Sequence, residues 1–248
     1  MLSKDEAVCL RAIDYSETSQ ILTLFAREAG KISAIAKGAK RPKSAFDGPV
    51  EILSWGRIVF TDADKDKLAT LTEFQQQPEF SKLRSNLFAM NCCMFAAELV
   101  NSLTHDHDAY PELYDSMIRF LEDVNDRQSD TPARETLGLL IVFQLTLLKE
   151  IGLKPVLNCC VNCKSGFNSG WREAHFSSSA NGLICGDCEG AFPEKIKLTR
   201  KTVHCLANLQ AIATTDEATL RNIEQVLVAH FTDILHRQPK MAKQILRK

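Results

Sequence analysis

Two pairs of closely spaced cysteines constrain this chain more than any other feature of its sequence. Cys160 and Cys163 form one C-x-x-C pair and Cys185 and Cys188 form another, with 21 residues between the pairs. A Zn²⁺ ion takes four thiolates at tetrahedral corners, and two such turns each supply two of them. The spacing is close to that of a zinc ribbon and slightly longer than its usual range. The sequence therefore predicts one Zn²⁺ held by Cys160, Cys163, Cys185 and Cys188.

Two other roles for these thiols have to be weighed, namely buried free cysteines and a redox-active pair. A redox pair opens a helix after a strand, whereas both pairs here lie in a stretch rich in Cys, Gly, Ser and Asn. Cys159 leaves a second choice open because it forms C-x3-C with Cys163, and we favour Cys160 because two intervening residues are the standard spacing. Four sulfur ligands leave no position for water, so the predicted metal is structural rather than catalytic.

The start of the chain and its apolar runs indicate where the protein works. Lys4, Asp5 and Glu6 stand where a secretory signal would carry its apolar stretch. The longest apolar run, residues 137–148, is too short to cross a bilayer. In the cytosol disulfides are disfavoured, so clustered cysteines there indicate metal or redox chemistry. We expect a cytoplasmic protein.

The first 78 residues have the pattern of a small all-β domain. Five short segments of strand-forming residues are separated by turn signals: 7–13, 20–25, 31–36, 52–60 and 68–74. The third segment alternates apolar with small or polar residues, as a half-buried strand does. Five strands are the number of an OB-fold barrel, and a small SH3-like barrel also fits this count.

After Pro78 the apolar residues follow a helical spacing. Helices are predicted over about 83–100, 111–124, 132–151, 198–213 and 217–235. Asp130-Thr131-Pro132 resembles the start of the third helix, and Gly152 resembles its stop. The expected fold class is multi-domain α+β. A five-stranded barrel occupies residues 1–78, an all-α domain occupies 79–248, and a four-cysteine zinc insert lies within it at 155–193.

A cluster of cations surrounds the third predicted strand. Between residues 27 and 43 there are six Lys or Arg against one Glu, although the whole chain has a net charge of -1. Such cations can engage successive phosphates and release counterions, and a plain solvated loop is the alternative. The candidate DNA-binding residues are Arg27, Lys31, Lys37, Lys40, Arg41 and Lys43. Phe46 and Trp55 are candidates for stacking on bases, with the barrel core as the alternative.

The sequence contains no local motif for catalysis. No histidine is followed two places later by glutamate, as a zinc deaminase of nucleic acids requires. Lys43-Ser44 resembles the end of a phosphate-binding loop, but Lys37 and Pro42 occupy the positions of its two required glycines. Residues 105–108, His-Asp-His-Asp, could ligate a metal, and a solvated link between helices is the alternative. We predict that the protein is not an enzyme, and an active site assembled from distant residues, for instance of a metal-dependent nuclease, stays open.

Four segments together resemble the RecO family of bacterial recombination mediators. They are the basic stretch 38–44 with Gly48, the strand 68–73, the segment 152–158 ahead of the first cysteine pair, and 182–188 with the second pair. Their order and spacing agree over essentially the whole chain. Three residues depart from the family pattern: Asn158 for Asp, Lys164 for a frequent Gly, and Asn181 for the first of a glycine pair. These departures concern the geometry of turns more than the set of metal ligands.

The resemblance implies an N-terminal OB-fold, a helical C-terminal domain and a zinc-bearing insert. It implies binding of single- and double-stranded DNA and annealing of complementary strands. It also implies contacts with RecR and with the C-terminal tail of the single-strand-binding protein, an indirect action on RecA, and a location at the bacterial nucleoid. A zinc-ribbon adaptor that binds only proteins is the remaining alternative.

Overall fold

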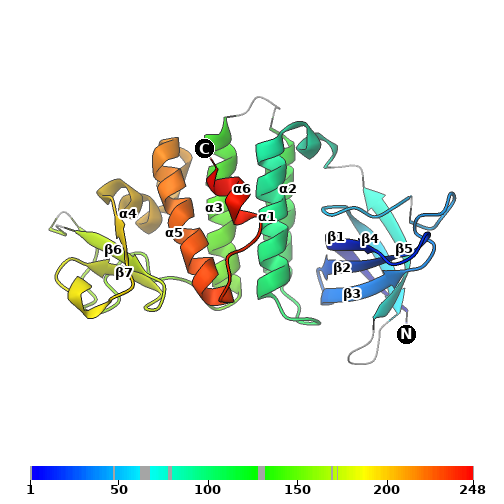
Figure 1. Cartoon of the computed structure of the whole chain (residues 1–248), viewed down its shortest axis with the longest axis horizontal. Coiled ribbons are helices and arrows are strands. Elements are labelled where there is room, and N and C mark those ends of the chain that lie inside the picture. Colours follow the sequence, from blue (N-terminus) through cyan, green and yellow to red (C-terminus); the bar gives the residue numbers. More distant parts are fainter. Residues whose placement is uncertain are drawn as a thin grey trace. The chain divides into compact units, whose positions relative to one another are not determined.

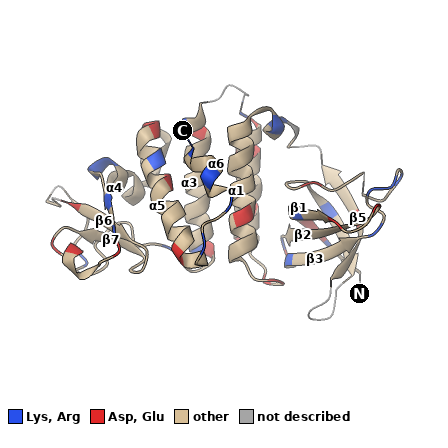
Figure 2. Ribbon diagram, viewed as in Figure 1, with Lys and Arg blue, Asp and Glu red and all other residues tan. Residues whose placement is uncertain are grey.

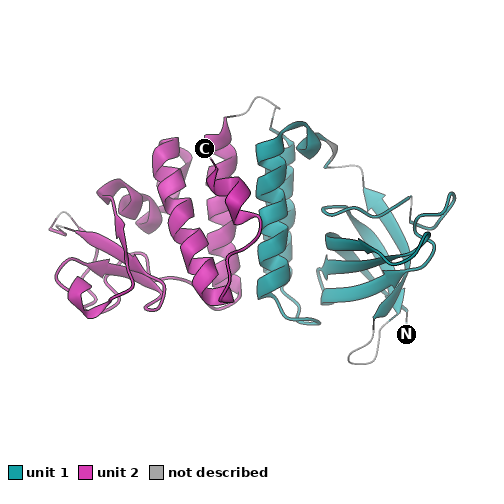
Figure 3. Ribbon diagram, in the orientation of Figure 1, with its two compact units in different colours: residues 1–129 teal, residues 130–248 magenta. Residues whose placement is uncertain are grey.

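The computed structural model describes residues 2–46, 48–61, 68–77, 80–127, 132–168, 170–171 and 173–247, with the backbone alone for Ser81. The chain forms two compact units, residues 1–129 and residues 130–248 (Figure 3). Among the helices of the described residues, none has the length and apolarity that a membrane span needs.

Five strands close into a barrel in the first unit (Figure 1). They are β1 (Leu2–Asp14), β2 (Gln20–Ala26), β3 (Gly30–Ala36), β4 (Trp55–Thr61) and β5 (Ala69–Gln77). The neighbour order is β1-β2-β3-β5-β4, and only β3 and β5 run parallel. β1 pairs through residues 2–8 with β4 and through residues 7–14 with β2, and its register shifts near Cys9. This confirms the predicted five-stranded OB-fold, in place of an SH3-like barrel.

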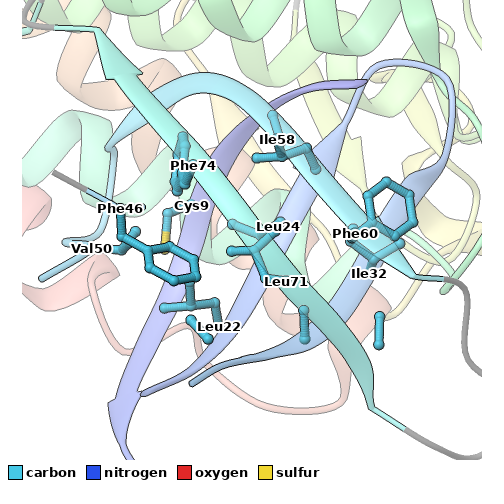
Figure 4. Close-up of a cluster of buried hydrophobic side chains, with 14 of the residues drawn as sticks. Cys9, Leu22, Leu24, Ile32, Phe46, Val50, Ile58, Phe60, Leu71 and Phe74 are labelled. Carbon is cyan, nitrogen blue, oxygen red and sulfur yellow. The ribbon is translucent and has the colours of Figure 1, made fainter. Parts of the chain in front are cut away.

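The barrel is filled by the inward-facing side chains of its strands. Because successive side chains of a strand point to opposite faces, Leu22, Leu24 and Ile32 share the interior. Figure 4 shows them together with side chains of the other strands and of the loop that follows β3. That loop contributes Phe46 and Val50 to the core, which fixes it against the end of the barrel. Phe46 therefore packs in the barrel core, which was the alternative to stacking on a base.

Two helices complete the first unit, namely α1 (Leu87–Leu103) and α2 (Pro111–Asn125), after the short 3-10 helix η1 (Ser81–Ser85). Asn86 caps α1, because its side chain accepts a hydrogen bond of 3.0 Å from the amide of Ala89. The compact unit thus includes α1 and α2 with the barrel. The barrel ends at Gln77, and the predicted domain boundary at residue 78 stays a prediction.

The second unit contains α3 (Ala133–Glu150), α4 (Arg200–Ala207), α5 (Glu217–Leu235) and α6 (Ala242–Leu246), with the 3-10 helices η2 (Glu189–Ala191) and η3 (Leu209–Ala213). Gly152, at φ 79°, ends α3 as predicted, because its amide and that of Leu153 donate to carbonyls of the last turn. Pro132 directly precedes α3, while Asp130 and Thr131 lie outside the described residues. The helix predicted over 198–213 is divided between α4 and η3, and α6 was not predicted.

A small sheet also forms in the second unit, in a segment whose residues show no regular apolar spacing. Its strands are β6 (Ala174–Ser177), β7 (Gly182–Cys185) and β8 (Ile196–Leu198), in the order β7-β6-β8. Every residue of β6 and β7 is buried. These strands have no exposed face, so they lack the alternation by which a strand is recognised in a sequence.

Candidate metal centre and nucleic-acid interface

The four predicted ligands come together in the second unit. The sulfur atoms of Cys160, Cys163, Cys185 and Cys188 all lie within 4.8 Å of one another. The sulfurs of Cys163 and Cys185 are 3.7 Å apart, and a tetrahedron with Zn–S bonds of about 2.3 Å would place them about 3.8 Å apart. Cys159 is not a member of this group of four, and its backbone pairs with Gly166. The donor set therefore fits one four-coordinate metal ion such as Zn²⁺.

Backbone hydrogen bonds bring the two cysteine turns face to face. In the first turn the amide of Lys164 donates to the carbonyl of Cys160 at 3.0 Å. In the second, the amide of Cys188 donates to the carbonyl of Cys185, the last residue of β7, at 3.1 Å. The amide of Val161 donates to the carbonyl of Leu183 at 2.8 Å and so joins the first turn to β7. The sheet thus sets the distance between the pairs.

Two of the three departures from the family pattern replace glycine and keep a backbone geometry that glycine favours. Lys164 has a φ of 62° and Asn181 a φ of 51°, both in the left-handed region. Asparagine visits this region more readily than most residues. Gly182 is required for a different reason, because a Cβ there would lie 2.5 Å from the carbonyl oxygen of Val156. The turns around the metal ligands are therefore preserved despite the substitutions.

The environment of the thiols differs between the two turns. Burial raises the pKa of Cys160, but hydrogen bonds from the backbone amides of Cys185, Cys163 and Asn162 outweigh it and lower this pKa to about 6. Burial raises the pKa of Cys185 to about 12. A bound cation would favour the thiolate form of both. Of these two thiols, Cys160 is thus the one whose thiolate form the surrounding amides favour, while Cys185 would ionise only with a cation beside it.

A second group of potential ligands in the described residues lies beside the cysteines. Glu173, His175 and Glu189 bring their ligand atoms within 4.8 Å of one another. Two lysines already neutralise the carboxylates, with Lys197 at 2.5 Å from Glu173 and Lys195 at 3.3 Å from Glu189. His175 contacts Glu189 at 3.1 Å. We interpret this group as a network of ion pairs that stabilises η2 next to Cys188.

The basic loop after β3 is held in one shape. It consists of two tight turns, since the amide of Arg41 donates to the carbonyl of Gly38 and that of Ser44 donates to the carbonyl of Arg41. The amide of Lys40 donates to the carbonyl of Thr18 at 3.1 Å, which ties the loop to the β1–β2 hairpin. Figure 2 shows the cations on this loop. The loop therefore presents its charges from a fixed backbone.

The four cations of the loop differ in their contacts. The side chains of Lys37, Arg41 and Lys43 belong to exposed residues. Lys40 forms an ion pair of 2.8 Å with Asp14, whose own side chain remains 65% exposed. Lys37, Arg41 and Lys43 are thus open to a phosphate from solvent, whereas Lys40 is partly buried and paired with Asp14. The role of all four in DNA binding stays a prediction.

Arg27 and Lys31, the other two candidates, are engaged within the first unit. Arg27 donates two hydrogen bonds of 2.9 Å to the carboxylate of Asp115 on α2. The ammonium of Lys31 donates to the carbonyls of Asn101 and Thr104 at the end of α1, at 2.9 and 2.6 Å, where a cation also complements the helix dipole. The structure thus assigns both cations a part in joining the barrel to the helices, and their part in DNA binding stays a prediction.

The remaining predicted candidates also have structural partners. The indole of Trp55 donates a hydrogen bond of 2.8 Å to the hydroxyl of Tyr114 on α2. Asp106, in the His-Asp-His-Asp segment, lies 3.2 Å from the ammonium of Lys31, and the amide of His107 donates to the carbonyl of Lys31. This segment links α1 to α2, which agrees with the interpretation of it as a link between helices and not as a metal site. Tyr15, which the sequence interpretation missed, is 64% exposed in the hairpin beside the basic loop.

Comparison with known proteins agrees with this architecture. The family model described as Recombination protein O N terminal matches residues 1–77, and that described as Recombination protein O C terminal matches residues 84–243. The chain is 35% identical over 208 residues to a DNA repair protein RecO of Alkaliphilus metalliredigens, covering 84% of this chain and 80% of the relative. It is 31% identical over 206 residues to that of Bacillus subtilis, covering 83% and 76%. The predicted resemblance is confirmed, and the chain belongs to the RecO family of DNA repair and recombination proteins.

Proposed function

We propose that this chain is a recombination mediator that works without an active site. It binds single- and double-stranded DNA without sequence specificity, promotes annealing of complementary strands, and with RecR helps to load RecA onto strands coated with single-strand-binding protein. The proposal that the protein binds DNA rests on one observation, the cationic loop that backbone hydrogen bonds hold at the end of an OB-fold barrel. The work would take place in the cytoplasm, at the bacterial nucleoid.

The loop would act through the phosphate backbone. Lys37, Lys40, Arg41 and Lys43 would bind successive phosphates, and because such contacts do not read bases the binding would be independent of sequence. Neutralising the charge of two strands lowers their repulsion, which would promote annealing. Arg27 and Lys31 remain in the proposed set as an extension of the track. Their expected share is smaller because each donates two hydrogen bonds that join the barrel to α1 or α2, whereas Lys40 has one ion pair, with the exposed Asp14.

The metal would have a structural role. Cys160, Cys163, Cys185 and Cys188 would hold one Zn²⁺, which supplies a cross-link between the two cysteine turns. An ion with four sulfur ligands has no position left for water, so it would not activate a nucleophile. The partners are proposed on family membership: RecR and the C-terminal tail of the single-strand-binding protein directly, and RecA indirectly.

The first prediction concerns the salt dependence of DNA binding. Replacing Lys37, Lys40, Arg41 and Lys43 with alanine should weaken binding of a single-stranded oligonucleotide. If four phosphate contacts are lost, the log–log slope of affinity against salt should become about 3 units shallower, from about 0.7 per contact. Fluorescence anisotropy of a labelled oligonucleotide over a salt series measures this. An Arg27→Ala, Lys31→Ala variant measures the share of the other two cations separately.

The same assay separates the competing functions. An unchanged slope in the quadruple variant would move the DNA site away from the loop. Absence of salt-dependent binding by the unmodified protein would favour a zinc-ribbon adaptor that binds only proteins. Cleavage of the DNA on addition of Mg²⁺ or Mn²⁺ would instead indicate a nuclease.

A further inference from the structure

An open apolar row crosses the outer face of the barrel beside the basic loop. Ile13 of β1 pairs in register with Ile21 of β2, which pairs with Ile35 of β3. Residues in register point to the same face, and the alternating residues such as Leu22 fill the core, so the three isoleucines face outward. Ile13 is 41% exposed, and Ile21 and Ile35 are half-buried. Three neighbouring strands thus offer an apolar strip to solvent.

The open part of this face has a limited extent. The adjacent outward row consists of Arg11, Thr23 and Ser33, which are exposed or half-buried. The row after it is covered, since Phe25 lies against Tyr114 of α2 with 6.0 Å between ring centroids and Lys31 binds the end of α1. Among the described residues of this face, those in the half nearest the basic loop therefore remain accessible.

Tyr15 stands at the loop end of the strip. It belongs to the hairpin between β1 and β2, where its amide donates to the carbonyl of Ser19 at 3.0 Å. The basic loop is bonded to the same hairpin through the amides of Lys40 and Gly38, which donate to the Thr18 carbonyl and the Ser19 hydroxyl. The exposed Tyr15 and the loop cations therefore belong to two loops that are bonded to each other next to the end of the isoleucine strip.

We propose that Tyr15 with Ile13, Ile21 and Ile35 forms a platform for the unpaired bases of single-stranded DNA. This inference rests on the proposed function, because the same strand's phosphates would be held by the loop. Apolar and aromatic surfaces bind any base through its face, which keeps the binding independent of sequence. Duplex DNA keeps its bases stacked inside, so it would use the cations alone. The exposed carboxylate of Glu17 lies in the same hairpin and would oppose phosphate there, which favours bases over backbone at the tip.

The test compares two ligands that differ only in their bases, namely an oligothymidine and an abasic oligonucleotide of the same length. The unmodified protein should bind the oligothymidine more tightly, by roughly fivefold or more for each stacked base. Tyr15→Ala should remove at least about fivefold of this preference while leaving the affinity for the abasic strand and the salt slope unchanged. Tyr15→Phe should retain the preference, because the ring remains. Ile13→Ser should reduce it independently of Tyr15.

The control is Leu87→Ala, which truncates a side chain that is 77% exposed on α1 of the same unit and should change neither affinity. Equal affinity of the unmodified protein for both strands would overturn the platform and leave the phosphate proposal intact. Loss of binding to both strands in the quadruple loop variant, with the ratio preserved in Tyr15→Ala, would also overturn it. If Tyr15→Ala preserves the ratio but abolishes capture of RecR, the surface is a protein-docking face and the inference is wrong.

Discussion

Glu224 is a carboxylic acid inside the second unit, where an ionised group is costly. It is 1% exposed, and the side-chain amide of Gln144 donates to one of its oxygens at 2.9 Å. Its other oxygen and the amide oxygen of Gln144 are both buried acceptors without a donor. A proton on Glu224 would satisfy both acceptors at once. Burial accordingly raises the pKa of Glu224 to about 7, although the hydrogen bond from Gln144 opposes the shift.

The second prediction follows from this raised pKa. In the unfolded chain Glu224 ionises above pH 4.5, whereas in the folded chain it keeps its proton to about pH 7. The unfavourable contribution of Glu224 to the free energy of folding therefore grows as pH rises between these values and is constant above them. The substitution Glu224→Gln retains hydrogen bonding to Gln144 but removes the group that ionises. It should leave stability unchanged near pH 4 and raise it by up to about 3 kcal/mol above pH 7, at 1.36 kcal/mol per pKa unit. Urea unfolding across this pH range measures the difference, and a difference independent of pH would contradict the assignment.

At the scale of elements, Tyr114 fixes α2 against the barrel. Its ring lies against Phe25, and its hydroxyl accepts the hydrogen bond from Trp55. The residue is 2% exposed, and burial raises the pKa of its phenol. Arg27 and Lys31 support the same contact between strands and helices. The six cations that are close together in the sequence thus have two different positions in the fold. Four lie on the loop after β3, and Arg27 and Lys31 join the barrel to α2 and α1.

The third prediction tests this contact between α2 and the barrel. Tyr114→Phe leaves the indole of Trp55 without its acceptor and should destabilise the protein by about 1 kcal/mol, the usual net value of such a hydrogen bond. The matched change Tyr15→Phe, at an exposed position, should alter stability by less than about 0.5 kcal/mol. Denaturant unfolding followed by tryptophan fluorescence reports both variants. Equal stabilities would mean that ring packing alone holds α2.

At the scale of the whole molecule, the two compact units have different sources of stability. The barrel has a continuous apolar core, whereas the cysteine-rich segment has short strands and a group of four sulfurs. Metal binding to such a segment contributes an apparent free energy of about 10–16 kcal/mol. Loss of the metal should therefore affect the second unit and spare the barrel.

The fourth prediction concerns removal of the metal. A Cys160→Ser, Cys163→Ser variant should lose bound zinc and become sensitive to protease within residues 155–193, while retaining oligonucleotide binding through the loop. Cys159→Ser is the matched control, and it should keep about one zinc per chain, because its sulfur lies outside the group of four. Atomic absorption and limited proteolysis measure the two effects. Zinc near stoichiometry in the double variant would refute the ligand set.

The sequence by itself determined the features that rest on local spacing. Two C-x-x-C pairs, five strand segments and the Gly152 stop were readable because turns, alternation and capping involve residues close together in the chain. Where burial removed the pattern, as in β6 and β7, the elements could not be predicted. The positive φ angles of Lys164 and Asn181 could not be predicted from the sequence either, because neither residue type indicates that conformation as strongly as glycine does.

Only the tertiary structure decided which side chains remain available to a ligand. Arg27 and Lys37 are alike in the sequence as cations near the same strand, yet one is bonded to Asp115, 88 residues away, and the other is exposed. Phe46 and Trp55 looked suited to stacking on bases but lie in the core and against α2, while Tyr15 is exposed beside the cations. The physical reason is that exposure depends on long-range packing, which brings together residues that no local pattern relates.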